Sequence, residues 1–162
     1  MEYNIDITVL ETPHVIVGAA IGAKFAHPLI SVPLAFGSHF LLDMVPHWNP
    51  HLNTETKKHG RPTNRSTLIV AADLLVAFGS VALITSSINP GDNIQLASIL
   101  GGAAAGIAPD VVEGPYFFLN MKNKLVEKWI MFQKSIQTDT SLIPGIATQI
   151  ITVLAAVWWI FS

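Results

Sequence analysis

Long stretches without charged residues dominate the pattern of hydrophobic and polar positions along this chain. The stretches that contain no Asp, Glu, Lys or Arg are residues 12–23, 25–42, 74–91, 93–109 and 140–162. A helix needs roughly 17–25 mostly apolar residues to cross a bilayer, and the last three stretches approach or exceed that length. The pattern therefore predicts an all-α fold, a polytopic membrane helical bundle of about five membrane helices.

The first two of these helices are expected to be short. Thr12 followed by Pro13 is typical of a helix N-terminus, because threonine caps well and proline fits the first helical position. A helix from Pro13 to Phe25 is only about 20 Å long at ~1.5 Å per residue. The next helix, 28–44, should end before Pro46, since proline disfavours helix at the residue before it. We expect the two helices to form a tight hairpin that enters the membrane and returns.

The later part of the chain predicts longer helices. Segment 46–65 is polar and contains several prolines and a glycine, so we expect a loop there. Two long helices are expected over 66–88 and 93–108, joined by a turn at 89–93. A final membrane span is expected over 141–161.

Segment 116–134 has a different pattern. Apolar side chains recur in it at steps of three and four, at Phe118, Met121, Leu125, Trp129 and Phe132. Lysines occupy other positions of the same segment, at Lys122, Lys124, Lys128 and Lys134. One apolar stripe opposite basic residues is typical of a helix that lies in the membrane interface. We therefore expect one interfacial amphipathic helix beside the membrane helices.

Composition agrees with a lipid environment. The 162 residues are 51% hydrophobic and only 12% charged, whereas an ordinary soluble domain has roughly 25% charged residues. The mean hydropathy is +0.49. We therefore expect a single integral membrane domain over residues 1–162, with the lipid bilayer as its partner. The formal charge of −2 leaves no basic excess for nucleic acid, and the lack of cysteine excludes disulfides and thiolate metal sites.

The distribution of basic residues predicts an orientation. Lys57, Lys58, Arg61 and Arg65 crowd the segment between the second and third helices, and four lysines precede the last span. The turn at 89–93 contains none. By the positive-inside rule, both basic segments face the cytoplasm. We expect the protein to be in the cell inner membrane.

Several ionisable residues lie inside or at the borders of the apolar stretches. By the predicted topology all of them are near the cytoplasmic end: His14, His39, Asp43, His47, Asp73, Asp110 and Glu113. Ionisable groups in membrane helices are energetically expensive, and by default they mark functional sites. Their common depth predicts one shared site.

His39 and Asp43 are the centre of this predicted site. Positions i and i+4 lie on one face of a helix about 6 Å apart, so an imidazole and a carboxylate there can bind one ion. His47 follows the break at Pro46, can fold back toward the same place, and is a further candidate metal ligand. The alternative is a His-Asp hydrogen bond or ion pair that only caps a short helix.

The other acidic and histidine residues also have two interpretations. Asp73, alone in an apolar helix, is either a metal-bridging carboxylate or a protonated carboxyl that hydrogen-bonds a neighbouring helix. Asp110 and Glu113 are candidate functional acids, although an acid just after Pro109 is also typical of a plain helix turn. His14 is a candidate ligand or an exposed first-turn residue. Small residues such as those at 101–106 predict close helix packing.

These residues carry a resemblance to known families. Residues 38–47, Ser-His-Phe-Leu-Leu-Asp-Met-Val-Pro-His, resemble the His-x-x-x-Asp-x-x-Pro-His element of zinc-dependent phospholipase C and related single-strand nucleases. With His14, a Pro-Asp step at 109–110 and small apolar helices, the chain is more similar to the LexA-regulated membrane-bound metal-dependent hydrolases. The resemblance covers residues 12–113.

The resemblance implies a ligand set and a departure from it. Carried over to this chain, His14, His39, Asp43 and Asp110 are the implied metal ligands. The hydrolase family also has a His-Arg-Gly-x-Thr-His-Ser element, and here Asn64 stands where its second histidine is expected.

Together these observations predict a membrane-embedded metal-dependent hydrolase. Mixed imidazole and carboxylate ligands suit a divalent metal, Zn²⁺ or alternatively Mn²⁺, and the expected substrate is a small phosphoester or lipid-like molecule at the cytoplasmic face. A spare carboxylate, Asp73 or Glu113, would be the catalytic proton acceptor. The alternative is a non-catalytic membrane scaffold or ion-binding module whose His and Asp residues are structural. An ion or proton translocator ranks last, because only Asp73 approaches the midplane.

Overall fold

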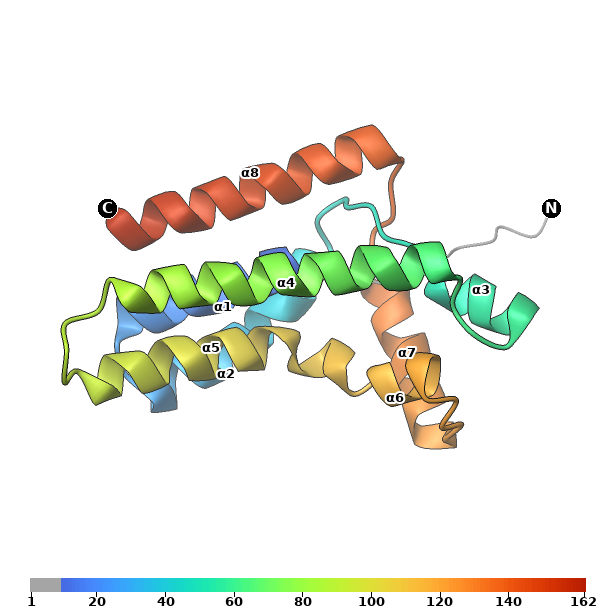
Figure 1. Ribbon diagram of the computed structural model, residues 1–162, viewed down its shortest axis with the longest axis horizontal. Helices are drawn as coiled ribbons and strands as arrows, with labels where there is room; N and C mark the ends of the chain where they lie inside the picture. The colour runs from blue at the N-terminus through green and yellow to red at the C-terminus, as the bar shows by residue number, and fades with distance from the viewer. Residues whose placement is uncertain (1–9) are drawn as a thin grey trace.

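The computed structural model describes residues 10–162 and is entirely helical over that range, as the sequence predicted (Figure 1). Its helices, in chain order, are α1 (Glu11–Phe25), α2 (Pro28–Asp43), α3 (Leu52–His59), α4 (Asn64–Ser86), α5 (Asn93–Val111), α6 (Gly114–Phe118), α7 (Lys124–Ile136) and α8 (Leu142–Phe161). Within the described part of the chain the only β contact is an isolated bridge between His47 and Asp139.

Three helices are long and apolar enough to cross a membrane: α4, α5 and α8. Helices α1 and α2 have only 15 and 16 residues. The chain turns sharply between the two helices. Ala26 has a left-handed backbone (φ 48°), and His27 caps α2 by accepting the Leu29 N–H. The expected α1–α2 hairpin is therefore present, and within residues 10–162 three helices have the length and hydropathy of a membrane span, against the expected total of about five membrane helices.

Helix α1 lies at the centre of the bundle, packed against α2, α4, α5 and α8. Its glycines allow a very close approach to α5. A Cβ atom added at Gly18 would lie 2.3 Å from the Gly102 carbonyl oxygen, and one at Gly22 would lie 2.4 Å from that of Ser98. At this distance no side chain fits between the helices. The small residues thus serve helix packing, as predicted.

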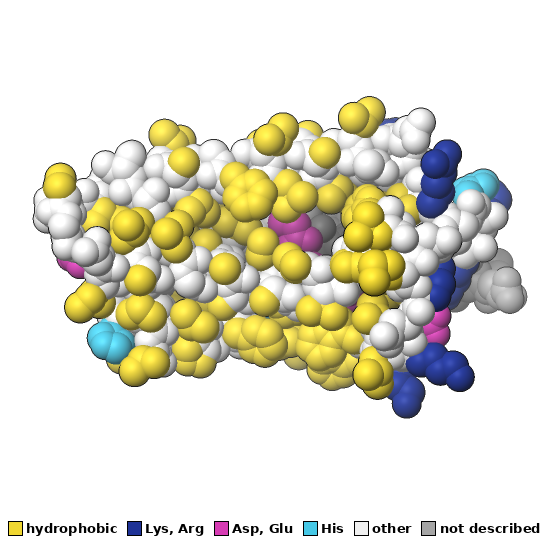
Figure 2. All heavy atoms as spheres, turned by 60° about the horizontal axis from the view of Figure 1, so that its bottom comes forward, with side chains coloured by type: hydrophobic (Ala, Val, Ile, Leu, Met, Phe, Trp, Pro, Cys, Tyr) yellow, Lys and Arg dark blue, Asp and Glu magenta, His cyan; other side chains and the backbone are white. Residues whose placement is uncertain are grey.

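The outer surface is apolar over most of its length. Leu68, Leu75 and Leu83 on α4 are each at least 70% exposed, and Ile143 on α8 is 83% exposed. Figure 2 shows hydrophobic side chains spread over one face of the molecule and Lys and Arg gathered at one end. This distribution is that of helices that face lipid, with the basic residues beyond one edge of the apolar zone.

Segment 46–65 is not simply a loop, which corrects the sequence-based prediction. It contains α3, whose C-terminus is closed by Gly60 in a left-handed conformation (φ 79°). The helix forms because Leu52 is fully buried against Phe117 and Ile130, and because Glu55 accepts hydrogen bonds from the start of α4. These tertiary contacts outweigh the polar local composition.

The expected single helix over 116–134 is also wrong. The segment forms two helices, α6 and α7, separated by Asn120 with a left-handed backbone (φ 54°). Asparagine adopts this conformation more readily than most residues, and Asn123 then caps α7 by accepting the Leu125 N–H. The two asparagines therefore break the helix that the apolar periodicity predicted.

Candidate metal centre

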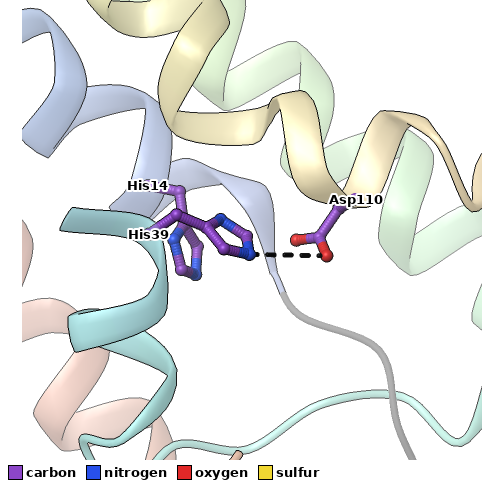
Figure 3. A group of neighbouring side chains, drawn as sticks. All are labelled: His14, His39 and Asp110. Atoms are coloured by element: carbon purple, nitrogen blue, oxygen red, sulfur yellow. Dashed lines mark ion pairs between the residues drawn. The ribbon is translucent and has the colours of Figure 1, made fainter. Parts of the chain in front are cut away.

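Three ionisable side chains meet where α1, α2 and α5 come together (Figure 3). His14 is in the first turn of α1, His39 is in the last part of α2, and Asp110 is near the end of α5. One possible ligand atom from each of the three lies within 4.8 Å of the other two. The two imidazole rings are also in contact, with centroids 4.3 Å apart. The structure thus brings together residues that are far apart in the sequence.

Asp43 lies against both imidazoles. One of its carboxylate oxygens is 3.6 Å from His14 Nε2, and the other is 3.4 Å from His39 Nε2. The Asp43 side chain is completely buried, and within residues 10–162 neither of its carboxylate oxygens has a hydrogen-bond partner. The i, i+4 spacing on α2 puts His39 and Asp43 on one face, which is the face turned toward α1.

His39 is held by its second ring nitrogen. His39 Nδ1 is 2.8 Å from the Gly106 carbonyl oxygen, which can only accept, so in the neutral ring Nδ1 carries the proton. In that neutral form the lone pair that a metal could use is on Nε2, which is 3.8 Å from Asp110 Oδ1, the pair marked in Figure 3. Without an ion, Nε2 must also carry a proton to donate to Gln133 Oε1, which is 3.1 Å away and can only accept. A backbone carbonyl that fixes the imidazole tautomer in this way is typical of histidine ligands to metals.

Gln133 on α7 is a site residue that the sequence analysis missed. Its side chain is 1% exposed, its Nε2 donates to Asp110 Oδ1 at 3.0 Å and to Glu113 Oε1 at 2.5 Å, and its Oε1 is 3.1 Å from His39 Nε2. Helix α7 therefore closes the site. The apolar stripe expected in this helix includes side chains that are exposed: Leu125 is 74% exposed and Phe132 is 48% exposed.

Glu11 is the second missed residue. It is the first residue of α1, 9% exposed, and lies near Asp110 and Asp43. It lies just before the charge-free stretch 12–23, and therefore outside the helix predicted from Pro13 to Phe25. The available signal was its spacing: Glu11 is three residues before His14, so both lie on one face of α1.

Asp73 has a different position from the other acids. Its Oδ2 accepts the backbone N–H groups of Glu11 and Thr12, and the Thr12 hydroxyl donates to the Asp73 carbonyl oxygen at 3.0 Å. The carboxylate of α4 thus caps the N-terminus of α1 from a neighbouring helix. Asp73 is outside the group of three, but it fixes the turn that carries Glu11 and His14.

Glu113 and His47 flank the group. Glu113, in the turn before α6, is 3% exposed. Burial first, and then the charge of Asp110, raise the pKa of Glu113 to about 8, although its Gln133 hydrogen bond acts in the opposite direction. His47 is 5% exposed, and its Nδ1 is 2.7 Å from the Val45 carbonyl oxygen. The structure does not include His47 among the three residues whose ligand atoms converge.

The group satisfies a test for a cation site. Among the described residues, several buried oxygens and nitrogens of the site lack any hydrogen-bond partner: Glu11 Oε2, His14 Nδ1, Asp43 Oδ1 and Oδ2, and Asp110 Oδ2. Four of these five atoms are carboxylate oxygens, which are electron-pair donors, and a buried unpartnered carboxylate oxygen is costly. A divalent cation would give these carboxylate oxygens a partner. The residues present therefore fit a metal ion.

Comparison of the chain with protein-family models, with curated proteins and with solved structures finds no match.

Proposed function

We propose that this chain is an integral membrane protein of the cell inner membrane that binds a divalent metal ion, Zn²⁺ or Mn²⁺, and hydrolyses a phosphoester or lipid-like substrate at the cytoplasmic face. The observation that carries this proposal is the convergence of His14, His39 and Asp110 with buried, unpartnered donor atoms around them. Such donors suit borderline divalent ions.

The residues around the ion have separate tasks in this proposal. When bound, the ion supplies Lewis acidity and a water whose pKa falls toward ~7. His14, His39 and Asp110 bind it, and Asp43 or Glu11 completes the set. Because the Asp73 carboxylate already accepts two N–H groups of α1, Glu113 is the better candidate to accept the proton of the attacking water.

An apolar cavity beside the start of α1 supports a lipid-like substrate. A cavity of about 250 Å³ lies between α1, α4 and α8, and apolar side chains such as Ile146, Ile150 and Val153 line it together with Asp73. On a different face, turned away from α8, Figure 2 shows acidic side chains recessed among hydrophobic ones. The basic residues gather at one end of the molecule, which by the positive-inside rule is cytoplasmic.

A non-catalytic scaffold is the second candidate. It is favoured by the hydrogen bonds of Asp73 to α1 and of Gln133 to α2 and α5, which tie helices together without any ion. In that case His39 and Asp43 would serve only to join α1, α2 and α5.

Metal analysis of untagged protein in detergent separates the two candidates. Under the hydrolase proposal, the parent and the control His59→Ala contain stoichiometric metal and cleave a chromogenic phosphodiester, while His39→Ala has lost both and remains folded. His59 is a suitable control because it is exposed at the end of α3. Under the scaffold alternative, the parent contains no metal, and His39→Ala loses about 1–3 kcal/mol of stability because buried partners are left unpaired.

A further inference from the structure

A second, smaller cavity adjoins the proposed metal centre on the side of α8. Its volume is about 20 Å³, and it is lined by His14, the C-terminal part of α2, His47 and three residues of α8 that include Thr148 and Gln149. A space of roughly 10–15 Å³ is enough for one water molecule if two to four polar partners surround it.

Three buried polar side chains line this cavity, and each has an unpartnered atom. Within residues 10–162, His14 Nδ1, His47 Nε2 and Gln149 Oε1 are all without a hydrogen-bond partner. The three residues are 2%, 5% and 8% exposed, respectively. They come from α1, from the turn after α2 and from α8. Three unsatisfied groups around one cavity are more than native interiors usually tolerate.

The other hydrogen bonds of these residues decide which atom donates. His47 Nδ1 lies 2.7 Å from the Val45 carbonyl oxygen, so in the neutral ring Nδ1 donates and Nε2 accepts. Gln149 Nε2 donates to the Trp48 carbonyl oxygen at 3.0 Å, which leaves Oε1 as an acceptor. For His14, Nε2 is the nitrogen nearest Asp43, so a ligand lone pair on Nε2 puts the proton on Nδ1.

We propose that one buried water occupies this cavity, accepts the His14 Nδ1–H, and donates its two hydrogens to His47 Nε2 and Gln149 Oε1. One donor and two acceptors match the capacity of a single water. The water holds His14 in the tautomer whose Nε2 faces the metal centre. His47 and Gln149 are thus positioning residues for a metal ligand and not ligands themselves. The inference rests on the proposed metal binding of His14.

The test makes two measurements on the full chain in detergent. The first is the affinity for Mn²⁺. The second is the number of imidazole nitrogens bound to Mn²⁺, read from the electron–nuclear hyperfine spectrum of protein labelled with ¹⁵N-histidine. The variants are His47→Leu and Gln149→Leu, which remove the two acceptors from different parts of the chain. The control is Thr152→Val, because Thr152 lines the same cavity while its hydroxyl donates within α8 to the Thr148 carbonyl oxygen at 2.9 Å.

We expect both leucine variants to bind Mn²⁺ about 10–100-fold more weakly, the usual loss when the partner of a histidine ligand is removed. Two coordinated nitrogens should remain in every variant, and Thr152→Val should bind like the parent. Three coordinated nitrogens in the parent that fall to two in His47→Leu would make His47 a ligand and overturn the inference. Unchanged affinity in Gln149→Leu would overturn it as well. A parent that binds no Mn²⁺ or Zn²⁺ refutes the proposed function itself, a separate outcome.

Discussion

Helices α1 and α4 are both apolar, but they have opposite surroundings. Eleven of the 15 residues of α1 are buried, whereas α4 buries only three of 23. Helix α1 is enclosed by α2, α4, α5 and α8, while Leu68, Leu75 and Leu83 of α4 are turned outward. The long helix α4 thus has the apolar outer surface expected of a helix that faces lipid. The short helix α1 is enclosed and contains His14. Apolar character is common to both helices, so the burial of α1 depends on its close contacts with α5 at Gly18 and Gly22.

The largest effect is expected from filling the α1–α5 contact. Gly18→Leu should destabilise the protein by at least about 3 kcal/mol, because its Cβ would meet the Gly102 backbone rather than a movable side chain. The control is Gly79→Leu in α4, where nothing lies within 4 Å. Thermal unfolding in detergent measures both variants. If the two variants are equally stable, α1 is not packed more tightly than α4, and the contrast between the two helices is wrong.

The next effect concerns metal. Adding Zn²⁺ at 100 times its Kd should stabilise the metal-free parent by about 2.7 kcal/mol, because the ion binds the folded state only. His39→Ala should show no such gain. Thermal unfolding with and without a chelator gives the measurement. A gain in His39→Ala as large as in the parent would place the ion elsewhere in the molecule.

A smaller effect is expected from removing the Asp73 carboxylate of α4, which caps the N-terminus of α1. Asp73→Ala should cost about 0.5–2 kcal/mol, because the N–H groups of Glu11 and Thr12 lose their acceptor. Asp73→Asn is the matched control, since its amide oxygen still accepts both bonds. If Asp73→Asn keeps metal and stability but loses hydrolysis, Asp73 is the proton acceptor after all, and the assignment to Glu113 is wrong.

The smallest effect is expected at α3. Hydrogen bonds from the Thr63 N–H and from the Ser66 and Thr63 hydroxyls lower the pKa of Glu55, although desolvation by burial, the largest single influence, acts to raise it. Because the folded pKa is below the ordinary 4.5, the stabilisation is present above pH 4.5 and is lost as pH falls through the folded value. Glu55→Gln should therefore melt lower than the parent at pH 7 and show a smaller difference at pH 3.5. A difference independent of pH would contradict this account.

The sequence predicted the long helices well, because the lack of charge over 74–91, 93–109 and 140–162 is itself the physical requirement for a membrane span. It could not indicate that α1 is the enclosed helix, since that depends on glycines at 18 and 22 meeting partners about eighty residues away. Long-range contacts of this kind leave no local pattern.

The sequence could predict only those site residues that lie on one helix face or at the same level of the predicted bundle. His39 and Asp43 follow from their spacing on α2. Gln133 did not, because glutamine in an amphipathic helix is usually solvated and only the break at Asn120 turns α7 onto the site. Asp73 was placed at the correct end of the bundle, but nothing in its neighbourhood indicated that its acceptor would serve the start of α1.

The enclosure of α1 has a consequence for biogenesis. Helix α1 is too short to cross a bilayer alone, and the helices that enclose it follow it in the chain and are synthesised later. His14 and His39 leave the ribosome before Asp110, and Gln133 comes later still. The candidate ligands therefore all precede α7, and a chain truncated before α7 would keep them, together with the Gly106 carbonyl that holds His39, but would lose the hydrogen bonds of Gln133.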